Sequence, residues 1–249
     1  MKIVLTSWFG HSYKVDGVRY PKLLSNENQL SQNIHDIWPE KANILMICSD
    51  PTECEDNDDS CHCFKESCLM NHFNVSKISI CDNRNQHILQ EAESKDVNVL
   101  ILVGGHVPTQ NAFFKKIGLK EYLQTYDGIV IAWSAGSMNC ADIVYACPEL
   151  EGEAIDPTYN RWITGLGLTD INIMPHYQYY RDEYVDGFRM IEDLVYLDSY
   201  VHDIIGIPDG SYILIDENEA TIYGEASLVR KGEEKQICSN NNCIIYKGE

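Results

Sequence analysis

Ser134 lies where a short apolar segment, Ile129–Trp133, gives way to small residues, and this placement favours nucleophilic chemistry. Ala135, Gly136 and Ser137 allow the sharp strand-to-helix turn of a nucleophile elbow, which lifts the serine side chain clear of the sheet. Amides at a helix N-terminus favour negative charge, so the hydroxyl would sit beside donors suited to an oxyanion. The same residues also suit an ordinary tight turn in which Ser134 only caps the helix.

A serine hydroxyl needs a base within hydrogen-bond reach, and eight histidines are available. His106 follows Gly104-Gly105, and His176 follows the segment 171–175, so both should line a cleft at strand ends. Four others stand in polar surroundings and are expected to be solvated: His11, His35, His72 and His87.

The base in turn needs an acceptor that fixes its tautomer. Asp209 follows a predicted strand at 204–207, and Glu149 lies downstream of the predicted Ser134 helix. Both carboxylates qualify on these grounds.

The elements that position these residues alternate between apolar runs and amphipathic segments. This alternation predicts an α/β fold, a mostly parallel sheet with helices on both faces, in a single domain over residues 1–249. Ligands bind beyond the carboxyl ends of the strands in such sheets, which would place Gly105 and Ser134 in one cleft. Strands are expected at 2–6, 42–48, 75–80, 97–103 and 129–133, and as a hairpin at 212–215 and 220–223. Helices are expected at 26–38, 61–74, 86–94, 109–122 and 189–197, with an acidic loop at 49–60.

Composition limits the classes of partner. The chain has 249 residues, 44% of them hydrophobic and 23% charged, with a formal net charge of −19. Phosphate contacts need clustered lysine and arginine, so nucleic acid and anionic membrane surfaces are not expected as partners. The sequence has no apolar run of membrane-spanning length and starts without a signal-peptide pattern, which favours a cytoplasmic protein.

The ten cysteines divide by their surroundings. Four lie in or next to apolar segments and are expected to be small buried hydrophobes: Cys48, Cys81, Cys140 and Cys147. Four more crowd into a polar stretch with His62: Cys54, Cys61, Cys63 and Cys68. Their spacing lacks the paired C-x2-C of zinc sites, so no metal or other cofactor is expected, although a metal-binding regulator is an alternative. Cys238 and Cys243 flank four polar residues that suit a hairpin turn.

Five short motifs together resemble the serine peptidase family of dipeptidase E, or aspartyl dipeptidase. They are Gly104-Gly105, the segment 132–136, Asn139, the segment 174–176 and the segment 206–210. The resemblance runs in order from about residue 2 to near residue 224. It implies a class I glutamine amidotransferase-like, flavodoxin-like three-layer α/β/α scaffold shared with cyanophycinase. Amidotransferases carry cysteine at the elbow, so Ser134 argues against glutamine hydrolysis by a thiolate.

The resemblance also implies roles for single residues. Ser134 matches the family nucleophile, His176 matches the base, and the amides of Gly105 and Ala135 match the oxyanion hole. Asp209 stands where the family carries glutamate, and Glu149 matches an acidic residue about fifteen positions after the serine that has also been assigned to the triad. We favour Asp209, because a position at a strand end is better fixed than one in an acidic loop.

This sequence departs from the aspartyl dipeptidases at a position that is expected to affect substrate preference. His106 replaces a further glycine, and so is a candidate substrate-binding residue. An acidic substrate would need a local cation, for which Arg181 and Arg189 are the nearest candidates, with Arg189 near the family's basic position.

The function expected is hydrolysis of dipeptides or short peptides, with an N-terminal aspartyl residue as one option. The partner is then a small peptide, with a homodimer allowed. The alternatives are a cyanophycinase-like hydrolase of β-aspartyl peptides and a non-catalytic amidotransferase-like protein that binds a ligand.

Overall fold

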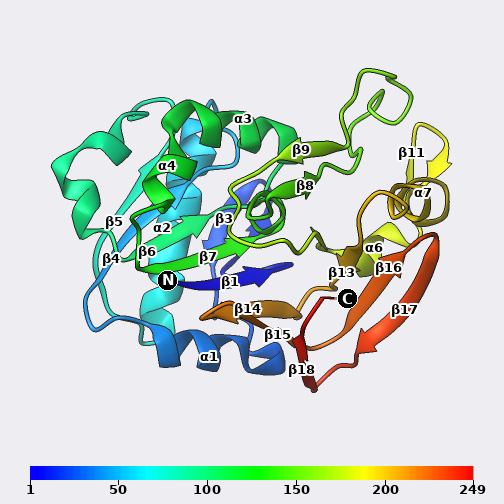
Figure 1. The fold of residues 1–249 in the computed structure, drawn as a ribbon. Helices are drawn as coiled ribbons and strands as arrows, with labels where there is room; N and C mark the ends of the chain where they lie inside the picture. The colour runs from blue at the N-terminus through cyan, green and yellow to red at the C-terminus, as the bar shows by residue number, and fades with distance from the viewer. Residues whose placement is uncertain (249) are drawn as a thin grey trace.

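The computed structural model of this chain describes residues 1–248 and is built around one eight-stranded sheet (Figure 1). In order across the sheet, the strands are β18 (Cys243–Tyr246), β15 (Glu219–Tyr223), β14 (Tyr212–Asp216), β1 (Lys2–Thr6), β7 (Ile129–Trp133), β6 (Val99–Leu102), β4 (Ala42–Ile47) and β5 (Val75–Cys81). The strands β1, β7, β6, β4 and β5 pair in parallel. The strands β14, β15 and β18 extend the sheet beyond β1 with antiparallel pairing.

The central parallel strands form from short apolar segments because both of their faces are buried. In β7, Val130 and Ala132 pack into one hydrophobic core, while Ile129, Ile131 and Trp133 pack into another on the opposite face. The same alternation divides the side chains of β1, β4 and β6 between the two cores. The predicted α/β fold with a mostly parallel sheet is confirmed, and so is the hairpin of β14 and β15.

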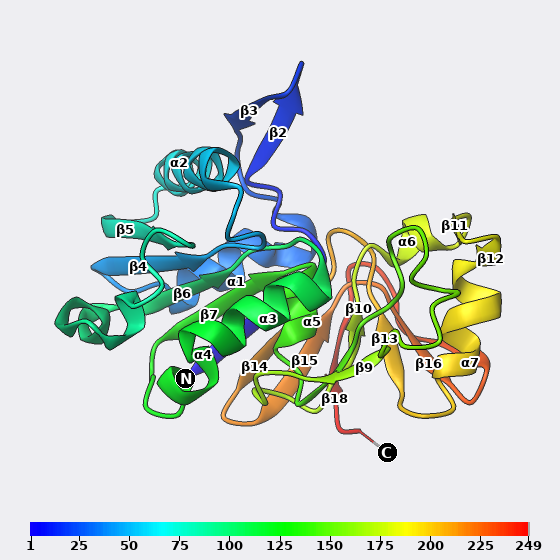
Figure 2. The ribbon, with the colours of Figure 1, turned by 90° about the horizontal axis from the view of Figure 1, so that it is seen from above.

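Helices cover both faces of this sheet (Figure 2). The first core includes Phe113 and Phe114, whereas the second includes Ile34 and Phe64. The longer helices are α1 (Leu30–Ile37), α2 (Cys54–Met70) and α3 (Val107–Ile117), and the short ones are α4 (Leu119–Leu123), α5 (Ala135–Asn139), α6 (Tyr177–Tyr180) and α7 (Tyr196–Asp198). Thus α1 and α2 lie on one face, and α3 lies on the other.

The predicted loop at 49–60 is wrong in its second half, because α2 begins at Cys54. Acidic side chains in a first helical turn are favourable beside the positive end of the helix dipole, and Glu55 and Asp56 occupy that turn. Asp56 also pairs with Lys14 at 2.7 Å and with Arg19 at 2.8 Å. The acidic run therefore forms the first turns of α2 instead of a loop.

Two other predicted helices take different forms. Over 86–94 the chain makes 3₁₀ turns, η2 (Ile88–Gln90) and then η3 (Ala92–Asp96). Over 189–197 it makes a π-helical turn, η4 (Met190–Val195), which runs into α7. A further 3₁₀ turn, η1 (Glu27–Gln29), precedes α1. The predicted helix 109–122 is divided into α3 and α4 at Gly118, which takes φ 71°.

Two of the predicted site residues, His176 and Asp209, follow strands of a second sheet. Its strands, in order, are β10 (Ile173–Met174), β13 (Ile204–Gly206), β16 (Ala226–Arg230) and β17 (Glu233–Cys238). Because β10 and β13 pair in parallel, the residues that follow them emerge at the same edge. The hairpin expected around Cys238 and Cys243 is wrong, since β17 pairs with β16 whereas β18 pairs with β15 in the main sheet.

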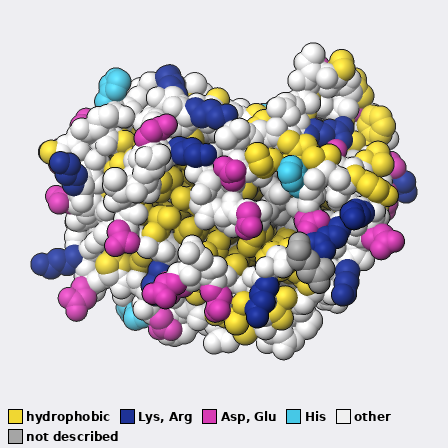
Figure 3. Space-filling model, viewed as in Figure 1, with side chains coloured by type: hydrophobic (Ala, Val, Ile, Leu, Met, Phe, Trp, Pro, Cys, Tyr) yellow, Lys and Arg dark blue, Asp and Glu magenta, His cyan; other side chains and the backbone are white. Residues whose placement is uncertain are grey.

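Three two-stranded ribbons complete the fold: β2 (Ser12–Val15) with β3 (Val18–Pro21), β8 (Ile143–Tyr145) with β9 (Trp162–Thr164), and β11 (Tyr184–Val185) with β12 (Phe188–Arg189). The β2–β3 ribbon projects from the body of the molecule (Figure 2). On the face drawn in Figure 3, basic and acidic side chains are interspersed. Within residues 1–248, no helix has the length and apolar character needed to cross a membrane.

His11 contradicts the prediction that it is solvated. Its side chain is buried against the rings of Phe9, Phe64 and Trp133, with 5.0 Å between the His11 and Trp133 ring centroids. Neither ring nitrogen has a hydrogen-bond partner within residues 1–248. Burial, assisted by the charge of Arg19, lowers the pKa of His11 to about 3. The polar sequence neighbours of His11 misled the prediction, because the segment that contains it packs against Phe64 of α2.

Replacing His11 with phenylalanine should raise the free energy of unfolding, because a similar ring remains without unpaired buried nitrogens. Folding lowers the pKa of this imidazole, so the wild type loses stability as pH falls from about 6.5 towards about 3. The variant should lack that loss, and its advantage should therefore grow with acidity. Urea denaturation at pH 7 and pH 4.5 measures both effects. An equal change at the two pH values would contradict the assignment of a neutral buried imidazole.

Candidate active site

Ser134 occupies the turn between β7 and α5 with φ 51° and ψ −126°, a strained conformation for a residue other than glycine. Its N–H donates to the carbonyls of Thr6 and Ser7 at 3.1 Å each, which ties the turn to the end of β1. Its side chain is half-buried, and Ser134 Oγ makes no hydrogen bond with residues 1–248. The predicted strand-to-helix turn is present with its hydroxyl unengaged.

Gly136 allows this turn because there is no room for a side chain. A Cβ there would lie 2.2 Å from the Leu102 carbonyl oxygen. Gly136→Ala should therefore destabilise the fold by about 1–3 kcal/mol, the usual range for an overpacked core. An alanine inside a helix would otherwise stabilise it by up to about 1 kcal/mol. Urea denaturation gives the sign, and a gain in stability would mean that the β7–α5 turn packs less closely on β6 than described.

The loop after β6 passes against the serine. A Cβ on Gly104 would lie 2.7 Å from Ser134 Cβ, and one on Gly105 would lie 2.3 Å from Ser49 Cβ. Neither position accepts a larger residue without movement. Among the backbone hydrogen bonds outside helices and strands within residues 1–248, none has the N–H of Gly105 or Ala135 as its donor; Ala135 is buried, and Gly105 is exposed.

His176 and Asp209 meet at the ends of β10 and β13. His176 caps α6 with φ 55°, and its Nδ1 lies 2.7 Å from Asp209 Oδ1. Burial raises the pKa of Asp209, but hydrogen bonds from His176, Ser7 and Gln178 outweigh this and hold that pKa below its ordinary value. An ionised Asp209 requires the hydrogen on Nδ1, which leaves Nε2 of the imidazole as a proton acceptor.

Ser7 links these residues and was missed from the sequence. Its buried hydroxyl donates to Asp209 Oδ1 at 2.7 Å and accepts the N–H of His176 at 2.7 Å. Its carbonyl accepts the N–H of Ser134. The one available signal was its position, directly after the first predicted strand. His176 and Ser134 are not hydrogen-bonded to each other, but both are anchored to this one residue.

Glu149 does not contact the imidazole. Its Oε1 accepts a hydrogen bond from Tyr180 at 3.0 Å, and burial raises the pKa of its carboxyl. Of the two carboxylates weighed in the sequence, Asp209 is therefore the one joined to His176 Nδ1.

The residues considered for substrate binding make other contacts. His106 Nε2 lies 2.9 Å from Glu153 Oε1, and its Nδ1 lies 2.8 Å from Thr109 Oγ1. Arg189 is exposed and pairs with Asp193 at 2.7 Å. Arg181 pairs with Glu234 and lies over the Tyr177 ring. Both arginines that could have received an acidic substrate are thus neutralised by carboxylates.

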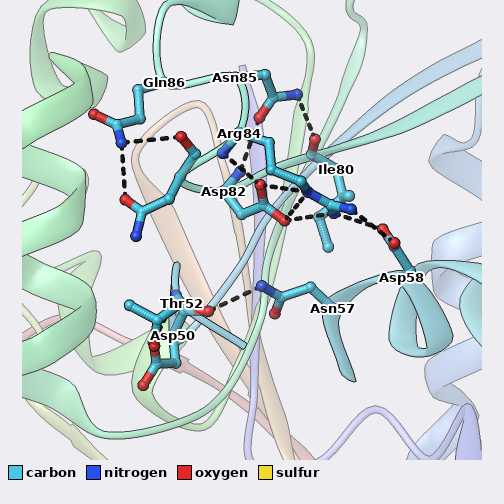
Figure 4. A network of polar contacts seen from close by, with 10 residues as sticks. Asp50, Thr52, Asn57, Asp58, Ile80, Asp82, Arg84, Asn85 and Gln86 are labelled. Carbon is cyan, nitrogen blue, oxygen red and sulfur yellow. Dashed lines mark hydrogen bonds and ion pairs between the residues drawn. The ribbon is translucent and has the colours of Figure 1, made fainter. Parts of the chain in front are cut away.

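A polar network lies at the ends of β4 and β5 (Figure 4). Arg84 forms paired hydrogen bonds with both Asp82 and Asp58, and Asn57 donates to the Asp50 carbonyl at 2.9 Å. Asp82 is buried, whereas Arg84 is half exposed. The network joins α2 to the loops after β4 and β5. With two carboxylates on one guanidinium, it offers no free cation to the site.

The cysteines of the polar stretch lie along α2. Cys63 and Cys68 are buried, while Cys54 and Cys61 are partly exposed, and all ten cysteines are free thiols. Among residues 1–248, no group of three or more potential ligands is arranged to hold a metal ion.

Comparisons with known proteins identify the fold and the family. Residues 24–223 match the model of peptidase family S51. A peptidase from an acI-B1 Actinobacterium has a similar structure, with a TM-score of 0.63 and 13% identity over 98% of this chain and 96% of the other. A putative peptidase E protein from Listeria monocytogenes EGD-e gives a TM-score of 0.54 and 12% identity over 95% and 98%.

No curated protein matches the sequence. The structural likeness at these low identities shows the fold, and the family match covers most of the chain. The chain therefore belongs to peptidase family S51, the dipeptidase E family that its sequence motifs predicted.

Proposed function

We propose that this chain is a serine-type peptidase that hydrolyses dipeptides or other short peptides through an acyl-enzyme. The observation that carries the proposal is the 2.7 Å contact between His176 Nδ1 and Asp209, which Ser7 links to the strained strand-to-helix turn of Ser134. Membership of a peptidase family supplies the substrate class. The mechanism is then that of a serine, histidine and carboxylate triad.

In this mechanism Asp209 keeps the hydrogen on Nδ1, so that Nε2 of His176 takes the Ser134 proton as the hydroxyl attacks the peptide carbonyl. The amides of Gly105 and Ala135 stabilise the oxyanion. His176 then protonates the leaving amine, and an activated water molecule releases the acyl group. Without substrate the hydroxyl is not hydrogen-bonded to the imidazole. The mechanism requires this contact to form as the peptide binds, and catalytic hydrogen bonds often tighten only in the complex.

The proposed substrates are dipeptides in general, without a preference for an N-terminal aspartyl residue. An N-terminal aspartyl residue would need a free cation in the pocket, and Arg181 and Arg189 are both paired with carboxylates. A cyanophycinase-like preference for β-aspartyl bonds is the alternative within enzymes. Parallel assays with α- and β-aspartyl dipeptides of the same composition would separate the two.

A dipeptide library incubated with the purified chain, with products followed by mass spectrometry, tests the proposed function. Free amino acids should accumulate, without a preference for aspartate in the first position. Exclusive cleavage of β-aspartyl bonds would favour the cyanophycinase-like alternative. A library that stays intact would favour a ligand-binding protein.

A further inference from the structure

The proposed nucleophile and the proposed base have strained backbones of the same kind, and Ser7 holds both of them. Ser134 has φ 51° and His176 has φ 55°, values that residues other than glycine rarely adopt. The Ser134 N–H donates to the Ser7 carbonyl at 3.1 Å, and the His176 N–H donates to the Ser7 hydroxyl at 2.7 Å. Strained conformations persist where the surroundings determine them, and here one residue contributes to both.

Ser7 reaches both residues because it directly follows β1, which pairs with β7 in the main sheet. Along β1 the side chains of Ile3 and Leu5 lie in the first core, which also holds Ile173 of β10 and Ile205 of β13. Ser7 continues this alternation, so its side chain meets the residues that follow β10 and β13. Figure 1 shows the tip of β1 directed towards β13. The carbonyl of Ser7 thus contacts the main sheet, and its hydroxyl contacts the second sheet.

The contacts of the Ser7 hydroxyl determine where its hydrogen lies. The His176 N–H can only donate, so Ser7 Oγ is its acceptor. A hydroxyl carries one hydrogen, and Ser7 Oγ lies 2.7 Å from Asp209 Oδ1 but 3.4 Å from His176 Nδ1. The shorter contact identifies the carboxylate as the acceptor of that hydrogen.

The same reasoning assigns the imidazole hydrogen. Asp209 Oδ1 accepts from the Ser7 hydroxyl and also lies 2.7 Å from His176 Nδ1. A ring nitrogen without a hydrogen could bond to this oxygen only if the carboxyl were protonated. The Ser7 hydroxyl opposes that protonation, because its hydrogen bond helps to lower the pKa of Asp209. Ser7 therefore favours the tautomer with the hydrogen on Nδ1, which leaves Nε2 to accept a proton.

We infer that Ser7 is a positioning residue for the proposed reaction: its hydroxyl fixes the carboxylate and the main chain of the base, and its carbonyl fixes the turn of the nucleophile. The inference rests on the proposed peptidase function. Ser7 acts through Asp209 and His176, since its side chain is fully buried and its hydroxyl is hydrogen-bonded within the protein. It adds to the triad a fourth residue that needs no contact with the peptide.

The first test is Ser7→Ala, which removes the hydroxyl and keeps the carbonyl. Its kcat on a dipeptide should fall by roughly 10- to 150-fold, the change that corresponds to losing a hydrogen bond to a charged group, while KM should be little changed. Ser67→Ala is the matched control, because Ser67 is also fully buried and its hydroxyl donates to the Lys22 carbonyl at 2.6 Å. The control should unfold at a lower temperature but keep wild-type kcat.

A double-mutant cycle separates positioning from a general effect on the fold. It compares the rate of Ser134 labelling by a fluorophosphonate in Ser7→Ala, Asp209→Asn and the double variant. Ser7→Ala should slow labelling by roughly 10-fold or more in the wild-type background, but by less than about 3-fold in the Asp209→Asn background. Ser7→Cys, whose thiol is a weak hydrogen-bonding group, should give the same pattern and replaces Ser7→Ala if that variant does not fold.

The tautomer can be measured without a substrate, by NMR of the imidazole nitrogens in the wild type. The His176 signals are assigned by their absence from His176→Ala. The neutral ring should carry its hydrogen on Nδ1, and a hydrogen on Nε2 would overturn the inference.

Two kinetic results would also overturn it: equal kcat for Ser7→Ala and the wild type, or equal slowing of labelling in both backgrounds. In either case the peptidase proposal would stand. If the wild type neither cleaved peptides nor reacted with the fluorophosphonate, the proposed function would fail. The NMR result would then still test the arrangement of Ser7, Asp209 and His176.

Discussion

Ser134→Ala should abolish peptide hydrolysis, lowering kcat by about 10³-fold or more and by as much as about 10⁶-fold if the triad acts as a unit. The reason is that, in the proposed mechanism, the hydroxyl at the β7–α5 turn forms the covalent intermediate. Initial rates with the best dipeptide of the library measure the effect. Thermal unfolding should be little changed, since Ser134 Oγ makes no hydrogen bond within residues 1–248.

Ser76→Ala is the matched control, because Ser76 is an exposed serine on the edge strand β5. Its kcat should equal that of the wild type. Full activity of Ser134→Ala in a preparation free of other peptidases would refute the acyl-enzyme mechanism.

Asp209→Asn should lower kcat by about 10⁴-fold, the loss seen when the carboxylate of a serine protease triad becomes an amide. The amide nitrogen can donate to Nδ1 of His176, which would move the ring hydrogen to Nε2 and block proton transfer from Ser134. The 2.7 Å contact with His176 Nδ1, together with the hydrogen bonds that hold the pKa of Asp209 below its ordinary value, favours an ionised carboxylate and the opposite tautomer.

The control for Asp209→Asn is Asp59→Asn, which makes the same change at an exposed position on α2 and should keep wild-type kcat. Both variants are to be compared by dipeptide hydrolysis and by thermal unfolding. If Asp209→Asn remained within about 10-fold of the wild type, Asp209 would only support the fold and another group would orient the imidazole.

The sequence predicted the sheet well because its strands are buried on both faces. Segments such as Ile129–Trp133 have no polar face, so their apolar runs are visible without knowledge of their neighbours. It failed where tertiary contacts decide the structure. The first turn of α2 carries Asp56, which pairs with Lys14 and Arg19, and the burial of His11 depends on rings from distant segments.

The sequence could predict those candidate site residues that directly follow strands. His176 and Asp209 both follow predicted strands, and these strands proved to be parallel neighbours. The choice between Asp209 and Glu149 needed atomic positions, since both are acids close to His176. Ser7 could not be found, because its role depends on Asp209, which is 202 positions away in the sequence. The single domain, the cytoplasmic setting and the allowance for a homodimer stay predictions.

The central claim is that Ser134 is a nucleophile activated by His176, and labelling with a fluorophosphonate measures this most directly. Mass spectrometry of the digested protein should show one adduct, on the peptide that contains Ser134. The adduct should be absent from Ser134→Ala and strongly reduced in His176→Ala, with Ser76→Ala labelled like the wild type. No adduct on the wild type, or one that forms equally fast without the imidazole, would contradict the account.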